Sequence, residues 1–220
     1  MVWKSLIFSS GKIEGPMQSR MKKLAVAILV LIVVVAVIFA AFIIKDGGGY
    51  EYGSVDIKNI VKGSEEIVLD GVSFSVSAGQ LWETAQTEIW AGVSEEEAYA
   101  HAEKALIEKY AMYYKATADG IVPDEEAMRA EVELNREVSK TASNYEDFRS
   151  FLAYLGMTHD EYWASQYTNF LEYDVINQFK QKLKNEFVGS GKNESDWESY
   201  YSTYVADAVK NEKIRVVQNS

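Results

Sequence analysis

The chain has 220 residues, a net charge of −11 at pH 7 and no cysteine. The lack of cysteine excludes disulfide bonds and zinc sites built from thiolates. Residues 1–44 carry five basic side chains and one acidic one, so the remaining 176 residues carry a net charge of −15. Such an acidic domain lacks the basic surface that nucleic-acid binding needs, so we expect no nucleic-acid partner. We also expect it to stand away from anionic lipid head groups.

Residues 24–44 form an unbroken apolar run, with no polar side chain between Leu24 and Ile44. In a helix this run would span roughly 31 Å, about the thickness of the hydrocarbon core of a bilayer. A helix buried in a soluble domain would keep a polar face over that length. The run therefore predicts a transmembrane helix in contact with lipid. A cleaved signal peptide is the alternative, but its apolar region is usually shorter and ends near an A-x-A pair, which is missing here.

The charges beside this run predict its orientation. Five basic residues precede it: Lys4, Lys12, Arg20, Lys22 and Lys23. Since positive flanks stay in the cytoplasm, residues 1–23 are expected inside the cell and the C-terminal domain outside it, as in a single-pass protein of a bacterial plasma membrane. The residues from Met21 onward also look like the start of a signal-anchor, so a start at Met21 in place of Met1 stays open.

The expected extracytoplasmic part begins with a tether over residues 45–65, which contains a Gly-Gly-Gly run, and continues as one domain over residues 66–220. Residues 66–76 combine an apolar strand, the pair Asp70-Gly71 and an alternating strand, which is the pattern of a β-hairpin with a type I′ turn. Residues 213–217 predict a short strand. We expect it to join the hairpin, because an isolated hairpin is marginally stable in water.

The rest of the domain is expected to be helical, giving a mostly α fold. Serine or threonine is followed three residues later by Glu or Gln at five positions: Ser77, Ser94, Ser143, Thr158 and Ser195. This spacing is typical of a capping box at a helix start. Pro123-Asp124 marks a further start, whereas Gly120 and Gly156 mark helix ends. The predicted helices cover residues 78–91, 95–118, 124–140, 144–155, 159–187 and 195–211.

Two of these helices carry apolar stripes at spacings of three and four residues. The stripe of the second helix is Ala98, Ala102, Leu106, Tyr110 and Tyr113. The stripe of the fifth helix is Trp163, Tyr167, Phe170, Tyr173, Ile176, Phe179, Leu183 and Phe187. Both stripes are rich in aromatic residues. These residues either fill the core or line a partly open groove, in which tyrosine and tryptophan offer apolar area with a polar tip. The candidate polypeptide-binding residues are Tyr110, Tyr113, Tyr114, Trp163, Tyr167 and Phe170.

Motifs for catalysis or metal binding are weak. His101 and Glu97 share a helix face, but no third ligand accompanies them and a solvated helix face explains them. His159 is explained by the helix start at Thr158. Acidic clusters lie in first helical turns, where the helix dipole favours them. No cofactor and no metal are expected. Asn193-Glu194-Ser195 fits a glycosylation acceptor, although Ser195 also fits a helix cap.

Four segments resemble SurA-like chaperone domains. Residues 69–75 resemble the opening of these domains, in which two strands flank Asp/Asn-Gly. Residues 116–126 resemble a helix that ends in A-x-x-x-G-I and is followed by V-S/T-D-E-E, with Pro123 in place of the usual Ser or Thr. Residues 151–163 resemble the corner F-x-x-x-L-G-M-T-x-E-x-Y/W, and residues 197–216 resemble the final helix and strand. The match covers residues 66–217.

This resemblance implies a SurA/trigger-factor-like helical module that cradles unfolded polypeptide outside the cytoplasm. In the foldases of the family a parvulin prolyl isomerase domain lies between the long helix and the last helix, where this chain has only residues 188–194. The resemblance therefore implies no catalytic residues. The expected function is that of a membrane-anchored chaperone-like protein for unfolded or exported polypeptides. The alternative is a structural or adaptor protein that holds one envelope partner. A hydrolase using Glu97 and His101 is a distant third.

Overall fold

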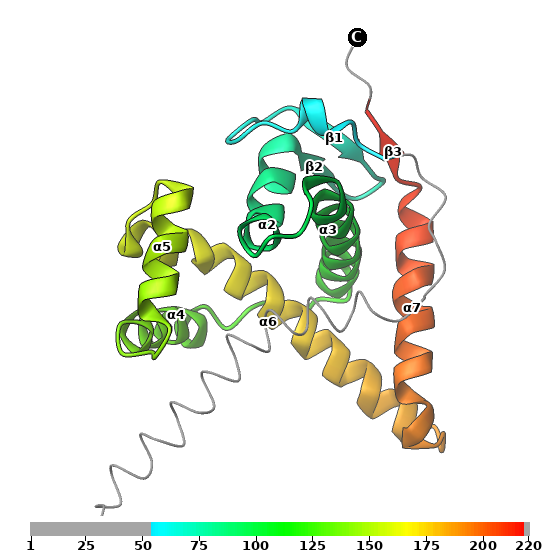
Figure 1. The fold of residues 1–220 in the computed structure, drawn as a ribbon. Coiled ribbons are helices and arrows are strands. Elements are labelled where there is room, and N and C mark those ends of the chain that lie inside the picture. The colour runs from blue at the N-terminus through cyan, green and yellow to red at the C-terminus, as the bar shows by residue number, and fades with distance from the viewer. Residues whose placement is uncertain (1–53, 218–220) are drawn as a thin grey trace, which may run out of the picture.

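The computed structural model describes residues 54–217 (Figure 1). The predicted cytoplasmic segment, the transmembrane helix over residues 24–44 and the first part of the tether lie outside these residues. Within residues 54–217 no helix combines the length and the apolar character needed to cross a bilayer.

The described chain is mostly helical, with a small sheet, as the sequence predicts. The 3₁₀ helix η1 (Ile57–Asn59) precedes strands β1 (Ile67–Asp70) and β2 (Ser75–Ser77). Five helices follow: α2 (Ala78–Trp90), α3 (Glu95–Ala118), α4 (Glu125–Ser139), α5 (Tyr145–Leu155) and α6 (His159–Gly189). The short 3₁₀ helix η2 (Glu194–Asp196) leads into α7 (Trp197–Glu212) and strand β3 (Arg215–Val216).

Side-chain caps explain most of the helix starts. Ser77 and Thr158 form complete capping boxes with Gln80 and Glu161, and Ser94 accepts a bond from the N–H of Glu97. Gly120 and Gly156 end α3 and α5 with φ of 82° and 69°, in the left-handed region that glycine tolerates best. These predictions are confirmed.

Two predicted caps, at Ser143 and Ser195, and the predicted place of Pro123 in a first helical turn are wrong. The helix expected from Ser143 begins after Asn144, without a side-chain cap. Ser195 lies inside η2, where its N–H donates to the Asn193 side chain, and α7 begins only at Trp197. Asp124 caps α4 by accepting from the Ala127 N–H, which leaves Pro123 before the helix and not in its first turn.

The three strands form an antiparallel sheet in the order β2–β1–β3, so the terminal strand joins the hairpin as expected. The hairpin turn differs from the prediction. Asp70 pairs with Ser75 and the Gly71 N–H donates to the Phe74 carbonyl at 2.8 Å, so four residues form the turn and Gly71 does not adopt a positive φ. A Cβ at this position would lie 3.0 Å from Ile214 Cδ1 and 3.2 Å from the Phe74 carbonyl oxygen, so a side chain here would require these neighbours to shift.

The helices pack as two units that share α6. The core unit contains the sheet, α2, α3, α7 and the C-terminal half of α6, which contributes Val175, Phe179, Leu183 and Phe187 to one continuous apolar core. The distal unit contains α4, α5 and the first turns of α6, and buries Phe151, Leu152, Leu155 and Trp163 outside that core. In Figure 1, α6 runs from the distal unit beneath α2 and α3 to the turn that leads into α7.

The segment before β1, placed in the predicted tether, is packed against the core unit from residue 55 onward. Val55 is buried and its N–H donates to the carboxylate of Glu103 at 3.4 Å. Lys62 reaches the distal unit, where its ammonium donates to the carbonyl of Leu155 at 2.7 Å. The folded domain therefore includes residues 55–65 as well as residues 66–217.

Candidate functional site

The three candidate tyrosines of α3 lie together beside the hairpin turn. The ring of Tyr114 stacks on Phe74 with a centroid distance of 6.0 Å, and Tyr113 meets Tyr114 edge-on at 5.4 Å. Tyr110 lies 5.5 Å from Phe74, and its hydroxyl accepts a bond from the Gln80 amide at 2.8 Å. Burial, followed by the nearby carboxylate of Glu172, raises the pKa of Tyr110 to about 12. Tyr114 is exposed, whereas Tyr110 and Tyr113 are half-buried.

These tyrosines flank the buried face of α3, which differs from the predicted stripe beyond Leu106. The residues that enter the core there are Ile107, Ala111, Met112 and Ala116. The rings of Tyr110 and Tyr113 are only partly buried and pack against the margin of the core. This placement leaves part of their area accessible at the surface.

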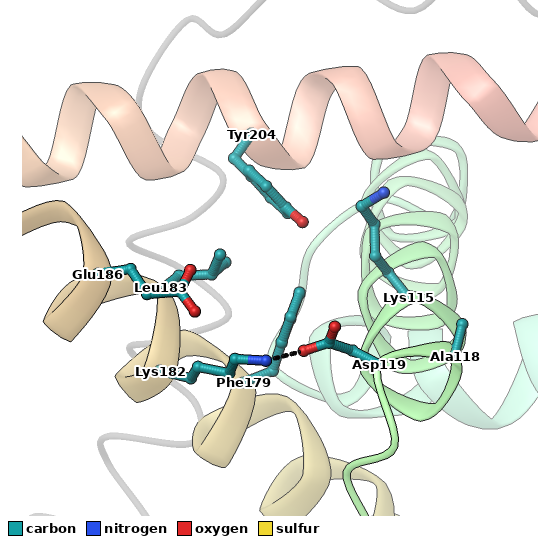
Figure 2. A pocket seen from close by; sticks show the side chains of 8 residues that line it. All are labelled: Lys115, Ala118, Asp119, Phe179, Lys182, Leu183, Glu186 and Tyr204. Atoms are coloured by element: carbon teal, nitrogen blue, oxygen red, sulfur yellow. Dashed lines mark hydrogen bonds and ion pairs between the residues drawn. The ribbon is translucent and has the colours of Figure 1, made fainter.

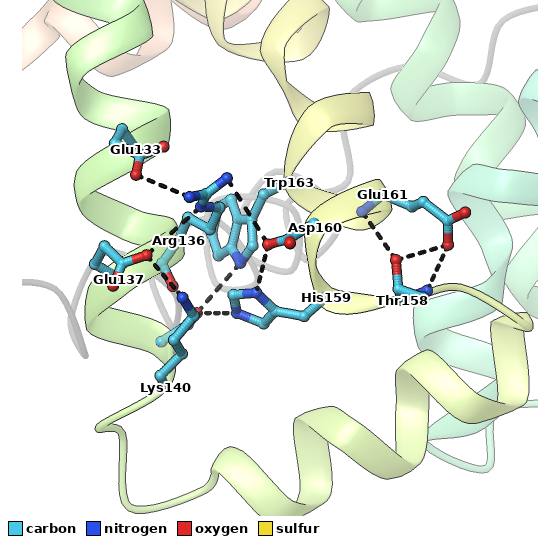
Figure 3. Close-up of polar contacts among 10 residues, drawn as sticks. Glu133, Arg136, Glu137, Lys140, Thr158, His159, Asp160, Glu161 and Trp163 are labelled. Atoms are coloured by element: carbon cyan, nitrogen blue, oxygen red, sulfur yellow. Dashed lines mark hydrogen bonds and ion pairs between the residues drawn. The ribbon is translucent and has the colours of Figure 1, made fainter.

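Trp163 lies in the distal unit, away from the α3 tyrosines. It is buried, and its indole N–H donates to Ser139 Oγ at 3.2 Å. Ser139 Oγ also donates to the carbonyl of Arg136 at 2.8 Å and lies 2.8 Å from His159 Nε2. The Nδ1 atom of His159 is 3.6 Å from a carboxylate oxygen of Asp160 (Figure 3). Trp163 therefore serves the packing of α4 against α6.

The order Ser139, His159, Asp160 looks like that of a nucleophile, a base and an orienting acid, but the hydrogen bonds indicate a structural role. When the Ser139 hydroxyl donates to the Arg136 carbonyl, His159 Nε2 donates to the hydroxyl oxygen and does not accept from it. A base in this position cannot take the serine proton. Ser139 is also only 3% exposed. The cluster holds α4 to the start of α6.

Tyr167 and Phe170 follow Trp163 along α6 and are half-buried. The Arg129 guanidinium of α4 lies over the Tyr167 ring, 5.7 Å from its centroid, and reaches its hydroxyl at 3.5 Å. Within residues 54–217, neither Tyr167 nor Phe170 has a ring contact with the α3 tyrosines. The six candidate residues thus form two separate groups, one on α3 and one on the first half of α6.

A buried ion pair lies between these two groups. Lys109 of α3 contacts Glu172 of α6 at 2.5 Å, and the two side chains are 8% and 15% exposed. The ammonium also donates to the amide oxygen of Asn169 at 2.8 Å and lies over the rings of Tyr110 and Tyr173, at 5.3 and 5.1 Å. The arrangement satisfies the buried charge and fixes the middle of α6 on α3.

A cavity of about 310 Å³ lies on the other side of this pair, where α3, α6 and α7 meet (Figure 2). Eight residues line it: Lys115, Ala118, Asp119, Phe179, Lys182, Leu183, Glu186 and Tyr204. None of them is among the six candidates. Phe179 and Leu183 belong to the predicted apolar stripe of α6, so the sequence pattern could have indicated them. No pattern in the sequence indicates the charged residues, because only the crossing of α3 and α6 brings them together.

His101, which was weighed with Glu97 for metal binding, contacts a residue of another helix. His101 Nδ1 contacts the Glu88 carboxylate of α2 at 2.7 Å, so this histidine links two helices. Within the described chain, no group of three side chains of the ligating types could hold a metal ion.

Neither a protein-family model, nor a curated protein, nor a solved structure matches this chain. The resemblance to SurA-like chaperone domains therefore rests on the order of the four sequence motifs.

Proposed function

We propose that the chain is a membrane-anchored, extracytoplasmic protein that binds unfolded or exported polypeptides without catalysis. The predicted anchor over residues 24–44 and the predicted orientation give its location. The order of SurA-like motifs gives the class of function. The helical domain supplies the binding surface.

The observation that carries this proposal is a set of large aromatic side chains at the surface. Trp90, Tyr114 and Tyr154 are 42%, 40% and 48% exposed. Aromatic rings with polar tips tolerate both water and an apolar ligand, so exposed rings of this kind suit contacts in a binding surface. A polypeptide that exposes apolar side chains would gain from covering these rings.

The same rings also favour an adaptor as a second candidate, because they are held in fixed positions. The Tyr154 hydroxyl donates to the buried amide of Gln86 at 2.7 Å, and Trp90 packs on Phe151 at 5.4 Å. A rigid surface suits one folded partner as well as many unfolded ones. The two functions differ in the number of partners that can be crosslinked in cells.

Aggregation suppression is the direct test. The full chain in lipid nanodiscs would be mixed with a chemically unfolded client at several molar ratios, with empty nanodiscs as the blank. We expect suppression at near-stoichiometric amounts and a clear loss in a Trp90→Ser, Tyr114→Ser double variant. Val122→Ser is the matched control, because this residue is 72% exposed and apolar but not aromatic.

A folded wild-type protein without any effect on aggregation would refute the chaperone function. In that case crosslinking in cells should give one stoichiometric species, which would identify an adaptor. A broad mixture of crosslinked clients, together with suppression in solution, would support the chaperone.

A further inference from the structure

The cavity between α3, α6 and α7 has an apolar floor and a polar rim. Phe179 and Leu183 of α6 are buried at its base, and Tyr204 of α7 meets Phe179 edge-on at 6.0 Å. Its volume of about 310 Å³ is at the lower end of the range of ligand sites, roughly 300–1,000 Å³. This space suits one apolar side chain with the backbone beside it and is small for a large cofactor.

The rim carries two cations and two anions, so it is locally neutral although the domain is strongly acidic. Lys182 and Asp119 form an ion pair with each other. Lys115 lies 5.7 Å from the centroid of the Tyr204 ring. Within residues 54–217, neither Lys115 nor Glu186 takes part in an ion pair. Figure 2 shows Lys115 and Glu186 on opposite sides of the cavity.

These two groups complement a peptide backbone. A lysine ammonium donates to a carbonyl and a glutamate carboxylate accepts from an N–H, so the pair can hold both polar groups of one extended segment. A free anion or cation would meet a charge of its own sign on one side of the rim. Burial raises the pKa of the Tyr204 hydroxyl, which keeps this part of the wall neutral.

We propose that this cavity receives one apolar side chain of an extended polypeptide, while Lys115 and Glu186 bind the backbone on either side of it. This inference rests on the proposed function and names a site for it. Phe179 and Leu183 provide the apolar contact, and Tyr204 closes the side that faces α7.

Photo-crosslinking with the full chain in nanodiscs tests the site. The probe is a short Ser/Gly peptide with one photo-leucine at its centre and a fluorophore at one end. Fluorescence anisotropy measures binding anywhere on the protein, and mass spectrometry maps the adducts. We expect adducts on residues 179–186 and on Tyr204. An unlabelled leucine peptide should compete, and its serine counterpart should not.

Rim variants test the role of the two charged groups. Lys115→Met and Glu186→Met should each weaken peptide binding roughly three- to tenfold, the effect of losing one hydrogen bond. Lys58→Met and Glu126→Met make the same changes at exposed positions away from the cavity and should leave binding unchanged. Equal effects in both pairs would refute the backbone contacts.

The outcomes separate this inference from the function on which it rests. Peptide binding with adducts confined to the α3 tyrosines, or to Trp90 of α2 and Tyr154 of α5, would overturn the cavity as the site. It would leave the proposed function standing. Suppression of client aggregation without any peptide binding would have the same meaning. A protein that neither binds peptide nor suppresses aggregation would overturn both.

Discussion

The buried pair of Lys109 and Glu172 offers the sharpest test of how α6 is held. The substitution Glu172→Gln removes the carboxylate and leaves the ammonium of Lys109 almost without exposure, at 8%. Removing one partner of a buried ion pair costs about 3–5 kcal/mol, because the remaining charge is neither solvated nor balanced.

The remaining contacts of Lys109 place the expected loss in free energy of unfolding at the lower end of that range. Lys109 keeps its hydrogen bond to Asn169 and its two ring contacts when Glu172 is neutral. We therefore expect Glu172→Gln to lower the free energy of unfolding by about 3 kcal/mol. The double variant Lys109→Met, Glu172→Gln should recover most of this loss, because no buried charge remains.

Urea denaturation of the two single variants and the double variant gives the coupling energy directly. Glu146→Gln is the control, since it breaks an exposed pair with Arg149 at 3.2 Å and should cost less than about 1 kcal/mol. A Glu172→Gln protein within about 1 kcal/mol of wild type would refute the reasoning. So would a double variant that is less stable than both single variants.

Three further predictions concern separate parts of the domain. Burial raises the pKa of Glu103, and the hydrogen bond from the Val55 N–H offsets this shift only in part. The folded protein therefore loses stability as the pH rises through the raised pKa and the buried carboxyl group ionises. In urea titrations, Glu103→Gln should be more stable than wild type at pH 7 and should lose this advantage near pH 4. Gly79→Ala should cost about 1–3 kcal/mol in the same assay, because its Cβ would lie 2.8 Å from the backbone oxygen of Ser64. Trp163→Ala should cost about 3–5 kcal/mol, and amide exchange should rise first in α4 and α5; an equal rise in α7 would contradict the two-unit packing.

The sequence predicts the helices well because their ends are local. Ser77, Thr158, Gly120 and Gly156 act within one turn of their own positions, so their spacing is sufficient. The errors are local as well. At residue 195 the Asn193 side chain takes the capping role earlier, and a 3₁₀ turn delays the helix by two residues.

The site was harder to predict because it depends on how helices cross. Spacing alone gives α3 a stripe through Tyr110 and Tyr113, yet the residues that are buried beyond Leu106 are Ile107, Ala111, Met112 and Ala116. The stripe that Trp163 shares with Phe179 leaves open whether Trp163 fills the core or lines a groove; it is buried, and the two residues enter different cores. A stripe shows that a face is apolar but does not show which neighbour covers each part of it.

The continuity of α6 has a consequence for binding. Its first turns belong to the distal unit, its middle is fixed on α3 by Lys109, and its last turns form the floor of the cavity. Helix α6, of 31 residues, therefore joins the distal unit, which carries the exposed Tyr154, to the cavity. Two sites on one molecule favour a ligand chain that is extended enough to reach both, because the second contact then forms at a high effective concentration. Under the proposed function, this arrangement predicts that the protein binds an extended polypeptide more tightly than a compact client.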